Sequence, residues 1–286
     1  MRLADIDFLI IGAAKSATTW LHKSLQSDPT VSMPDPELHY FSREYQRGHD
    51  WYLSQFDRQP PHVRVGEKSN SYLDGPRAPP RVHEALPHVR LIAQLRNPVE
   101  RAYSDYCMLF RRGEVGRNID DHLDPRRADG NRFLSGGLYH RQIEAYLELY
   151  PRERLQILFY EDLRRDPQAH LAAARAFLGL PEASMPTPVT GRVKDKRAGV
   201  INPALKPYLS GLKPLVAPLR GTAAFDALRK LVARPMRYAT MSTDLRQRLV
   251  DYYAPEAESL GRLVGHDLTS WLRDRPGTTP AGGDDA

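Results

Sequence analysis

Residues 6–20 most constrain the fold, because they join a short apolar run to a helix through one glycine and a few small residues. Residues 6–11 are largely apolar and stop at Gly12. Trp20, Leu21 and Leu25 then recur at helical spacing over residues 17–27. So short a run, ended by glycine and followed by a helix, is typical of a buried strand in a parallel sheet.

The same alternation of strand and helix continues along the chain. Further strands are predicted over residues 63–65, 90–96 and 155–160. Further helices are predicted over residues 49–56, 79–86, 98–110, 138–150, 168–178 and 242–263. Such a series predicts a single α/β domain over residues 1–274, with a central parallel sheet flanked by helices and a helical C-terminal third.

Two segments are predicted to be irregular. Residues 112–136 are polar and rich in Gly, Asp and Arg, so we expect a long loop there. Residues 275–286 contain mainly Pro, Gly, Thr and Asp, and we expect a disordered tail.

Cysteine content and hydropathy bear on the compartment. Cys107 is the one cysteine, so no disulfide forms within the chain. Acidic residues interrupt the first apolar run, and no stretch approaches the ~18 apolar residues of a membrane span. These features favour a cytoplasmic protein without signal peptide or membrane span.

The net charge of +6 is concentrated in one segment. Residues 203–237 hold seven basic side chains and one acidic side chain, within a segment expected to be helical over residues 203–240. This segment is either a solvated basic face or a surface for an anionic acceptor or a membrane. No nucleic-acid-binding motif accompanies it, so we expect no nucleic-acid partner.

The residues between the first strand and helix are suited to an anion. Lys15 supplies a charge, and Ser16, Thr18 and Thr19 supply hydroxyl donors where free backbone N–H groups open a helix. The segment is not a Walker A loop, which requires a second glycine before the lysine.

A second anion site is predicted where residues 90–96 meet the following helix. Arg96 stands where a P-loop NTPase would carry an aspartate for magnesium, and Ser104 lies further along the helix. Together with the first loop, this arginine indicates a ligand with two separated phosphates and speaks against a magnesium site. No cluster of His, Cys or Asp has the spacing of metal ligands.

Three segments in order resemble the motifs of sulfotransferases that use 3'-phosphoadenosine-5'-phosphosulfate (PAPS). They are KSATTW over residues 15–20, LRNP over residues 95–98 with Ser104, and LFYEDL over residues 158–163. The resemblance implies a P-loop-NTPase-like α/β fold and PAPS as cofactor, with no metal. It also implies transfer of the sulfuryl group to an acceptor hydroxyl or amine.

The resemblance also implies which residues bind the cofactor. The 5'-phosphosulfate would be held by Lys15, Ser16, Ala17, Thr18, Thr19 and Trp20. Arg96 and Ser104 would hold the 3'-phosphate, and Tyr160 would lie near the adenine. Lys196 and Arg197 stand in for the family's basic C-terminal loop over the cofactor.

Two further segments are similar to the heparan-sulfate glucosaminyl branch of that family. PELHYF over residues 36–41 contains Glu37, which matches that branch's proposed catalytic base, and GEK over residues 66–68 contains Lys68, which would lie near the transferring group or Glu37. Lys15 would stabilise the bridging oxygen as the nucleotide leaves. Asn70 occupies the position at which the phenol and steroid branch has a catalytic histidine. The alternatives are a surface carboxylate at Glu37 and a structural ion pair at Lys68, and His39 is expected to pack or hydrogen-bond rather than to catalyse.

Ala17 departs from the family pattern, which has glycine there. Its methyl group is expected to be tolerated if the backbone stays helical. The acceptor is expected to be a sugar hydroxyl or a small natural product. The rival functions are a small-molecule kinase or other NTPase, which would require Mg²⁺, and a non-catalytic basic binding protein.

Overall fold

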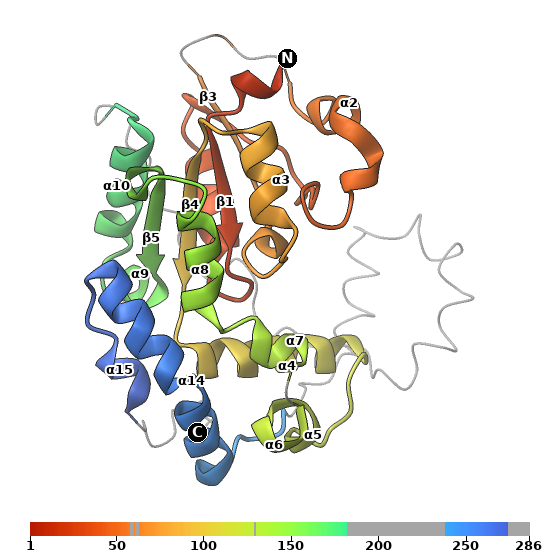
Figure 1. The fold of residues 1–286 in the computed structure, drawn as a ribbon, viewed down its shortest axis with the longest axis vertical. Helices are drawn as coiled ribbons and strands as arrows, with labels where there is room; N and C mark the ends of the chain where they lie inside the picture. Colours follow the sequence, from red (N-terminus) through yellow and green to blue (C-terminus); the bar gives the residue numbers. More distant parts are fainter. Residues whose placement is uncertain (58–59, 61–62, 129, 182–237, 274–286) are drawn as a thin grey trace, which may run out of the picture.

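The computed structural model describes residues 1–57, 60, 63–128, 130–181 and 238–273. Its centre is a parallel sheet with the strand order β2-β3-β1-β4-β5 (Figure 1). The strands are β1 (Phe8–Gly12), β2 (Val31–Ser32), β3 (Arg64–Lys68), β4 (Arg90–Leu95) and β5 (Leu155–Phe159). The predicted parallel sheet is confirmed, and β2 is an additional strand that is too short to give a periodic signal in the sequence.

Strand β1 lies in the middle of the sheet and is buried on both faces. Phe8 and Ile10 share a core cluster with side chains of α1 (Thr18–Gln26) and α10 (Pro167–Leu178), whereas Leu9 and Ile11 share one with side chains of α3 (Ala78–Ala85) and α8 (Tyr139–Leu147). Alternate residues of a strand point to opposite faces, so both parities must be apolar here. This is the physical reason for the continuous apolar run.

The helices that cover the sheet agree with the predicted helices in position. The longer helices are α1 (Thr18–Gln26), α2 (Gly48–Leu53), α3 (Ala78–Ala85), α4 (Pro98–Arg112), α8 (Tyr139–Leu147), α10 (Pro167–Leu178) and α14 (Thr243–Val264). Short 3₁₀ turns cover Leu3–Asp5, Tyr45–Arg47, Asn70–Tyr72 and Arg152–Arg154.

The prediction of a loop over residues 112–136 was wrong. This segment contains α5 (Asp120–Leu123), α6 (Pro125–Ala128) and α7 (Arg132–Ser135). In Figure 1, α5 and α6 lie below α4, and α7 lies against α4. Leu123, Phe133 and Leu134 join a core cluster with α4 and α14. Each helix has only four residues, so no apolar period was visible in the sequence.

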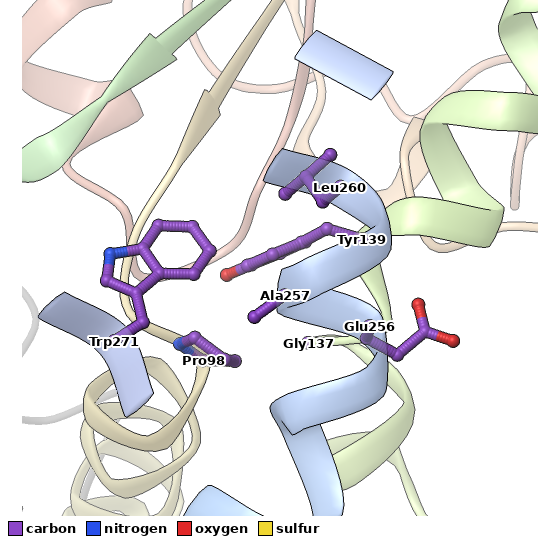
Figure 2. A pocket seen from close by; sticks show the side chains of 7 residues that line it. All are labelled: Pro98, Gly137, Tyr139, Glu256, Ala257, Leu260 and Trp271. Atoms are coloured by element: carbon purple, nitrogen blue, oxygen red, sulfur yellow. The ribbon is translucent and has the colours of Figure 1, made fainter. Parts of the chain in front are cut away.

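Helices α14 and α15 (Thr269–Leu272) confirm a helical C-terminal part and close one side of the molecule. Figure 2 shows where they meet the start of α4, with the Trp271 indole and the Tyr139 ring on either side of the contact. The seven residues that line this seam are Pro98, Gly137, Tyr139, Glu256, Ala257, Leu260 and Trp271. The seam has no room for a water-sized molecule, so it is a packing contact rather than a ligand site.

Several predictions fall on residues outside the described part of the chain. They concern the basic segment up to residue 237, the cofactor residues Lys196 and Arg197, and the tail over residues 275–286. Among the helices that the structure does describe, none is long and apolar enough to cross a membrane.

Candidate active site

The carboxyl ends of β1, β3 and β4 bring the predicted site residues to one edge of the sheet. In the parallel register Ile10 pairs with Lys68, and Gly12 pairs with Ala93, two residues before Leu95. The three adjacent strands therefore end at the same edge of the sheet. The residues found at or just after these ends are Lys15, Lys68 and Arg96. This is the edge at which α/β sheets bind their ligands.

The turn between β1 and α1 has an unusual backbone. Lys15 and Ala17 have φ angles of 71° and 64°, in the left-handed region that favours glycine. A helical backbone at Ala17, the condition for tolerating its methyl group, is not found, because Ala17 is the N-cap of α1 and has ψ 24° in the left-handed conformation. A left-handed N-cap explains why glycine would suit this position better.

The N-terminus of α1 is suited to bind an anion. Ala17 has no side-chain oxygen, and among the described residues no side chain caps this end of the helix. Trp20 donates its N–H to the Ala17 carbonyl at 2.9 Å, so the N–H groups of Thr18 and Thr19 and the positive end of the helix dipole are those suited to a phosphate or phosphosulfate group. The residues present thus fit the 5' end of PAPS.

A chain of hydrogen bonds joins this loop to the predicted base. Lys68 Nζ lies 2.6 Å from Glu37 Oε1. Asn70 donates its backbone N–H to Glu37 Oε2 at 3.1 Å and its side-chain amide to Oε1 at 3.1 Å. Thr18 donates its hydroxyl to Asn70 Oδ1 at 2.6 Å. The carboxylate and the phosphate loop therefore belong to one site.

The environment of Glu37 favours its ionised form. Burial would raise the pKa of Glu37, but the charge and hydrogen bond of Lys68 and the backbone N–H of Asn70 hold the pKa below its usual value. The Glu37 side chain stays 21% exposed, whereas Lys68 is 3% exposed. Glu37 is therefore a carboxylate at neutral pH and faces solvent in part, as a proton acceptor requires.

His39 agrees with its expected supporting role. Its Nδ1 lies 2.7 Å from Ser71 Oγ, and its Nε2 lies 3.8 Å from Glu37 Oε2. Burial lowers the pKa of His39, and Arg43 lowers it further, which favours the neutral ring.

The buried side chain of Glu67 supports the site through hydrogen bonds. Glu67 is fully buried and accepts hydrogen bonds from Tyr72 at 2.6 Å and from Ser69 at 2.7 Å. Burial raises the pKa of Glu67 to about 7. Ser69 Oγ also accepts the backbone N–H of His39 at 2.8 Å, which connects β3 to the segment that carries Glu37.

The second predicted anion site is formed by Arg96 at the end of β4. Its guanidinium Cζ lies 4.7 Å from the ring centroid of Tyr160, and Nη1 donates to the Lys15 carbonyl at 3.3 Å. Tyr160 begins the short helix α9 (Tyr160–Arg165), where a strand end was expected. Ser104 is buried on α4, the helix that follows Arg96. This planar cation over an aromatic ring is suited to bind a phosphate beside an adenine.

Three polar residues of the site were missed by the sequence analysis. Asn70 was noted only for the histidine that it replaces, although it links Thr18 to Glu37. Gln94 lies in the apolar strand β4 and donates to the Ser16 carbonyl. Arg246 of α14 pairs with Glu100 at 2.8 Å, and Glu100 lies 3.8 Å from Arg96. An amide inside an apolar strand was a usable signal, whereas the contact of Arg246 was not visible in the sequence.

Comparison with known proteins decides the family. The model of the sulfotransferase domain family matches residues 5–194, which include every described site residue predicted above. This chain belongs to the sulfotransferase domain family. Residues 195–286 lie beyond the match, and they include Lys196, Arg197 and helix α14.

Relatives with curated names act on heparan sulfate. The sulfotransferase domain is 30% identical to a bifunctional heparan sulfate N-deacetylase/N-sulfotransferase 1 of Caenorhabditis briggsae, with 94% of this chain and 31% of that protein covered. It is 28% identical to human heparan sulfate glucosamine 3-O-sulfotransferase 6, with 91% of this chain and 72% of that protein covered. The chain thus spans about a third of the length of the bifunctional relatives.

A solved structure supports the fold. A sulfotransferase from Alicyclobacillus acidocaldarius superposes with a TM-score of 0.70 at 24% sequence identity, covering 94% of this chain and 99% of that one. This likeness confirms the predicted sulfotransferase fold with its central parallel sheet.

Proposed function

We propose that this sulfotransferase moves the sulfuryl group of PAPS onto an amino or hydroxyl group of a glucosamine-type sugar. The observation that carries the proposal is the continuous contact from Thr18 through Asn70 to Glu37 and Lys68. It joins a carboxylate that is ionised at neutral pH to a helix N-terminus suited to a phosphosulfate. Membership of the family supports PAPS as the donor.

The proposed mechanism assigns a role to each charged group. When bound, PAPS supplies the sulfuryl group, whose bond to the 5'-phosphate oxygen breaks as the acceptor nitrogen or oxygen bonds to sulfur. Glu37 accepts the proton that the acceptor atom loses. Lys68 orients Glu37 through the 2.6 Å contact and places a positive charge beside it. Lys15 and the first turn of α1 stabilise the negative charge that develops on the leaving 5'-phosphate.

The choice of acceptor rests on the relatives. The two relatives described above are named for N- and 3-O-sulfation of heparan sulfate, and this chain aligns with each over more than nine-tenths of its length. A carbohydrate acceptor is therefore favoured over a phenol or steroid. Asn70 supports this choice, because it replaces the histidine of the phenol and steroid branch and donates a hydrogen bond to Glu37.

The alternative of a kinase or NTPase receives less support from the site. Arg96, rather than an acid, follows β4, and it lies over Tyr160. A magnesium–nucleotide complex would require an acidic ligand at this strand end.

Replacement of Glu37 by Gln tests the proposed base. Gln keeps the volume and can still accept from Lys68 or Asn70, but it cannot take a proton. We expect Glu37→Gln to lower turnover by about a hundredfold or more. The dissociation constant of 3',5'-adenosine bisphosphate, measured by calorimetry with EDTA present, should change little.

The control is Asp35→Asn, which removes a more exposed carboxylate of the same segment that pairs with Lys23. It should retain turnover on a glucosamine-containing oligosaccharide. Near-normal turnover of Glu37→Gln would remove Glu37 from the base role. Failure of the wild-type protein to bind the bisphosphate without metal would contradict the donor assignment.

A further inference from the structure

The phosphate loop is tied to the sheet by the side chain of Gln94, in β4, and by that of Arg96, which directly follows β4. Arg96 donates to the carbonyl of Lys15 at 3.3 Å, and the Gln94 amide donates to the carbonyl of Ser16. The backbone carbonyl of Gln94 also accepts the N–H of Ala13 at 2.8 Å. Gln94 and Arg96 thus hold the loop at three of its residues. Ser16 lies between the two left-handed residues Lys15 and Ala17.

Gln94 is an unusual residue for its position. Its side chain is fully buried in a strand whose other interior residues are apolar. A buried amide without partners costs free energy, so both ends of this amide require hydrogen bonds. The loop carbonyl satisfies only the NH₂ end.

His170 of α10 satisfies the other end. Its Nε2 lies 3.0 Å from Gln94 Oε1, and the ring is 4% exposed. The Ser16 carbonyl can only accept, so the Gln94 NH₂ group must face it and the Gln94 oxygen must face His170. His170 therefore donates from Nε2. Burial lowers the pKa of His170 to about 4, which favours the neutral ring.

The same histidine contacts the helix that follows the loop. The ring centroids of His170 and Trp20 are 6.0 Å apart in an edge-on arrangement. One side chain of α10 thus contacts both Gln94, behind the loop, and Trp20, in the first turn of α1.

We infer that Gln94, oriented by His170, is a positioning residue that holds the phosphate loop in the conformation that receives the 5' end of the nucleotide. The inference rests on the proposed function, because it concerns the same cofactor. The loop needs such a support because Ala17 has a left-handed backbone. Glycine would adopt its left-handed angles without steric cost, whereas alanine must be held there by neighbouring groups.

Gln94→Met tests the inference, because Met has a similar volume and cannot donate to Ser16. The probes are 3',5'-adenosine bisphosphate and adenosine 3'-monophosphate, which lacks the 5'-phosphate. Both are titrated by calorimetry into the full chain with EDTA present. We expect the affinity for the bisphosphate to fall about tenfold, as for loss of one well-placed hydrogen bond, while the affinity for the monophosphate is retained.

Two further variants separate positioning from general stability. His170→Phe keeps an aromatic ring beside Trp20 but removes the donor to Gln94, so it should give the same ligand selectivity even if Gln94→Met does not fold. Ala17→Gly, added to Gln94→Met, should recover part of the lost affinity, because glycine needs less support. The matched control is Tyr150→Phe, which removes a buried hydrogen bond to the Leu86 carbonyl far from the loop. It should lower the melting temperature without changing either affinity.

The outcomes distinguish the two proposals. The positioning role would be overturned if Gln94→Met and His170→Phe lost affinity equally for both ligands, or for neither. The proposed function would then stay intact. Failure of the wild-type chain to bind the bisphosphate would overturn the proposed function, and the positioning role with it.

Discussion

Two residues of the phosphate loop have backbone angles that L-amino acids rarely adopt. The left-handed conformations of Lys15 and Ala17 cost roughly 1–2 kcal/mol each relative to right-handed ones. Local preference opposes this loop, so contacts from β4 and from α10 must stabilise it. The identity of Ala17 could be read from the sequence, but its backbone conformation could not.

Lys68 is predicted to set the pH at which Glu37 becomes protonated. Burial raises the pKa of Glu37, and Lys68 is the largest influence that lowers it. Removing that cation leaves burial to dominate, so the pKa of Glu37 rises. We expect Lys68→Met to shift the acidic limb of the kcat/KM profile to higher pH, besides lowering turnover.

The control for this shift is Lys23→Met. Lys23 pairs with Asp35 rather than with Glu37, so its loss should leave the acidic limb in place. An acidic limb that does not move in Lys68→Met would mean that Glu37 is not the group titrating in the profile.

Single elements were predicted where their residues form a repeating apolar pattern. Helix α4 was expected over residues 98–110 and is found at Pro98–Arg112, with the Asn97 side chain accepting from Val99 and Glu100 at its start. By contrast, α5 buries only Leu123, and α7 only Phe133 and Leu134, in the cluster with α4 and α14. These short helices exist because of tertiary contacts, which a local pattern does not report.

Helix α14 begins with a side-chain cap that can be tested by itself. Ser242 is the N-cap residue, and its Oγ accepts the N–H of Leu245 at 3.1 Å. Ser242 is exposed, so its replacement leaves the core unchanged. Ser242→Ala should lower the free energy of unfolding by about 1 kcal/mol in urea titrations.

Thr243→Ala is the matched control for this cap. Thr243 is the adjacent exposed hydroxyl residue, inside the first turn of α14. Thr243→Ala should lower the free energy of unfolding clearly less than Ser242→Ala does. Equal losses for the two variants would contradict the capping role of Ser242.

At the scale of the whole molecule, the C-terminal helices support the second anion site. The Trp271 carbonyl accepts from the Asn97 side chain at 3.4 Å, next to Arg96. The Trp271 ring packs against Tyr139 and Phe159, with centroids 6.0 Å and 5.9 Å apart. A segment beyond the family match thus positions the turn that follows β4.

Trp271→Ala is expected to weaken both the fold and this site. Truncating a buried tryptophan should lower the free energy of unfolding by about 3 kcal/mol or more, measured by urea unfolding. The affinity for adenosine 3'-monophosphate should fall as well, because the start of α4 loses its support. Trp271→Phe fills most of the space, so it should lose less unfolding free energy and less affinity for adenosine 3'-monophosphate. If Trp271→Ala is destabilised but keeps its affinity for adenosine 3'-monophosphate, the packing around Trp271 does not support the nucleotide site.

The sequence by itself determined the order of the longer strands and helices and the candidate residues for the chemistry. The element order and the candidate residues are encoded locally. Buried parallel strands must be apolar on both faces, and an anion-binding loop is short and contains small and basic residues. Glu37, Lys15, Lys68 and Arg96 could therefore be predicted, and the structure places them at one edge of the sheet.

Only the tertiary structure decided how these residues are held. The link from Asn70 to Glu37 spans 33 positions in the sequence, that from Gln94 to Ser16 spans 78, and that from His170 to Gln94 spans 76. Contacts between such distant residues depend on how the strands and helices pack, and a hydrogen bond between two of them leaves no repeating pattern in the sequence. The left-handed backbone of Ala17 has the same origin, because neighbours from other elements maintain it against its own preference.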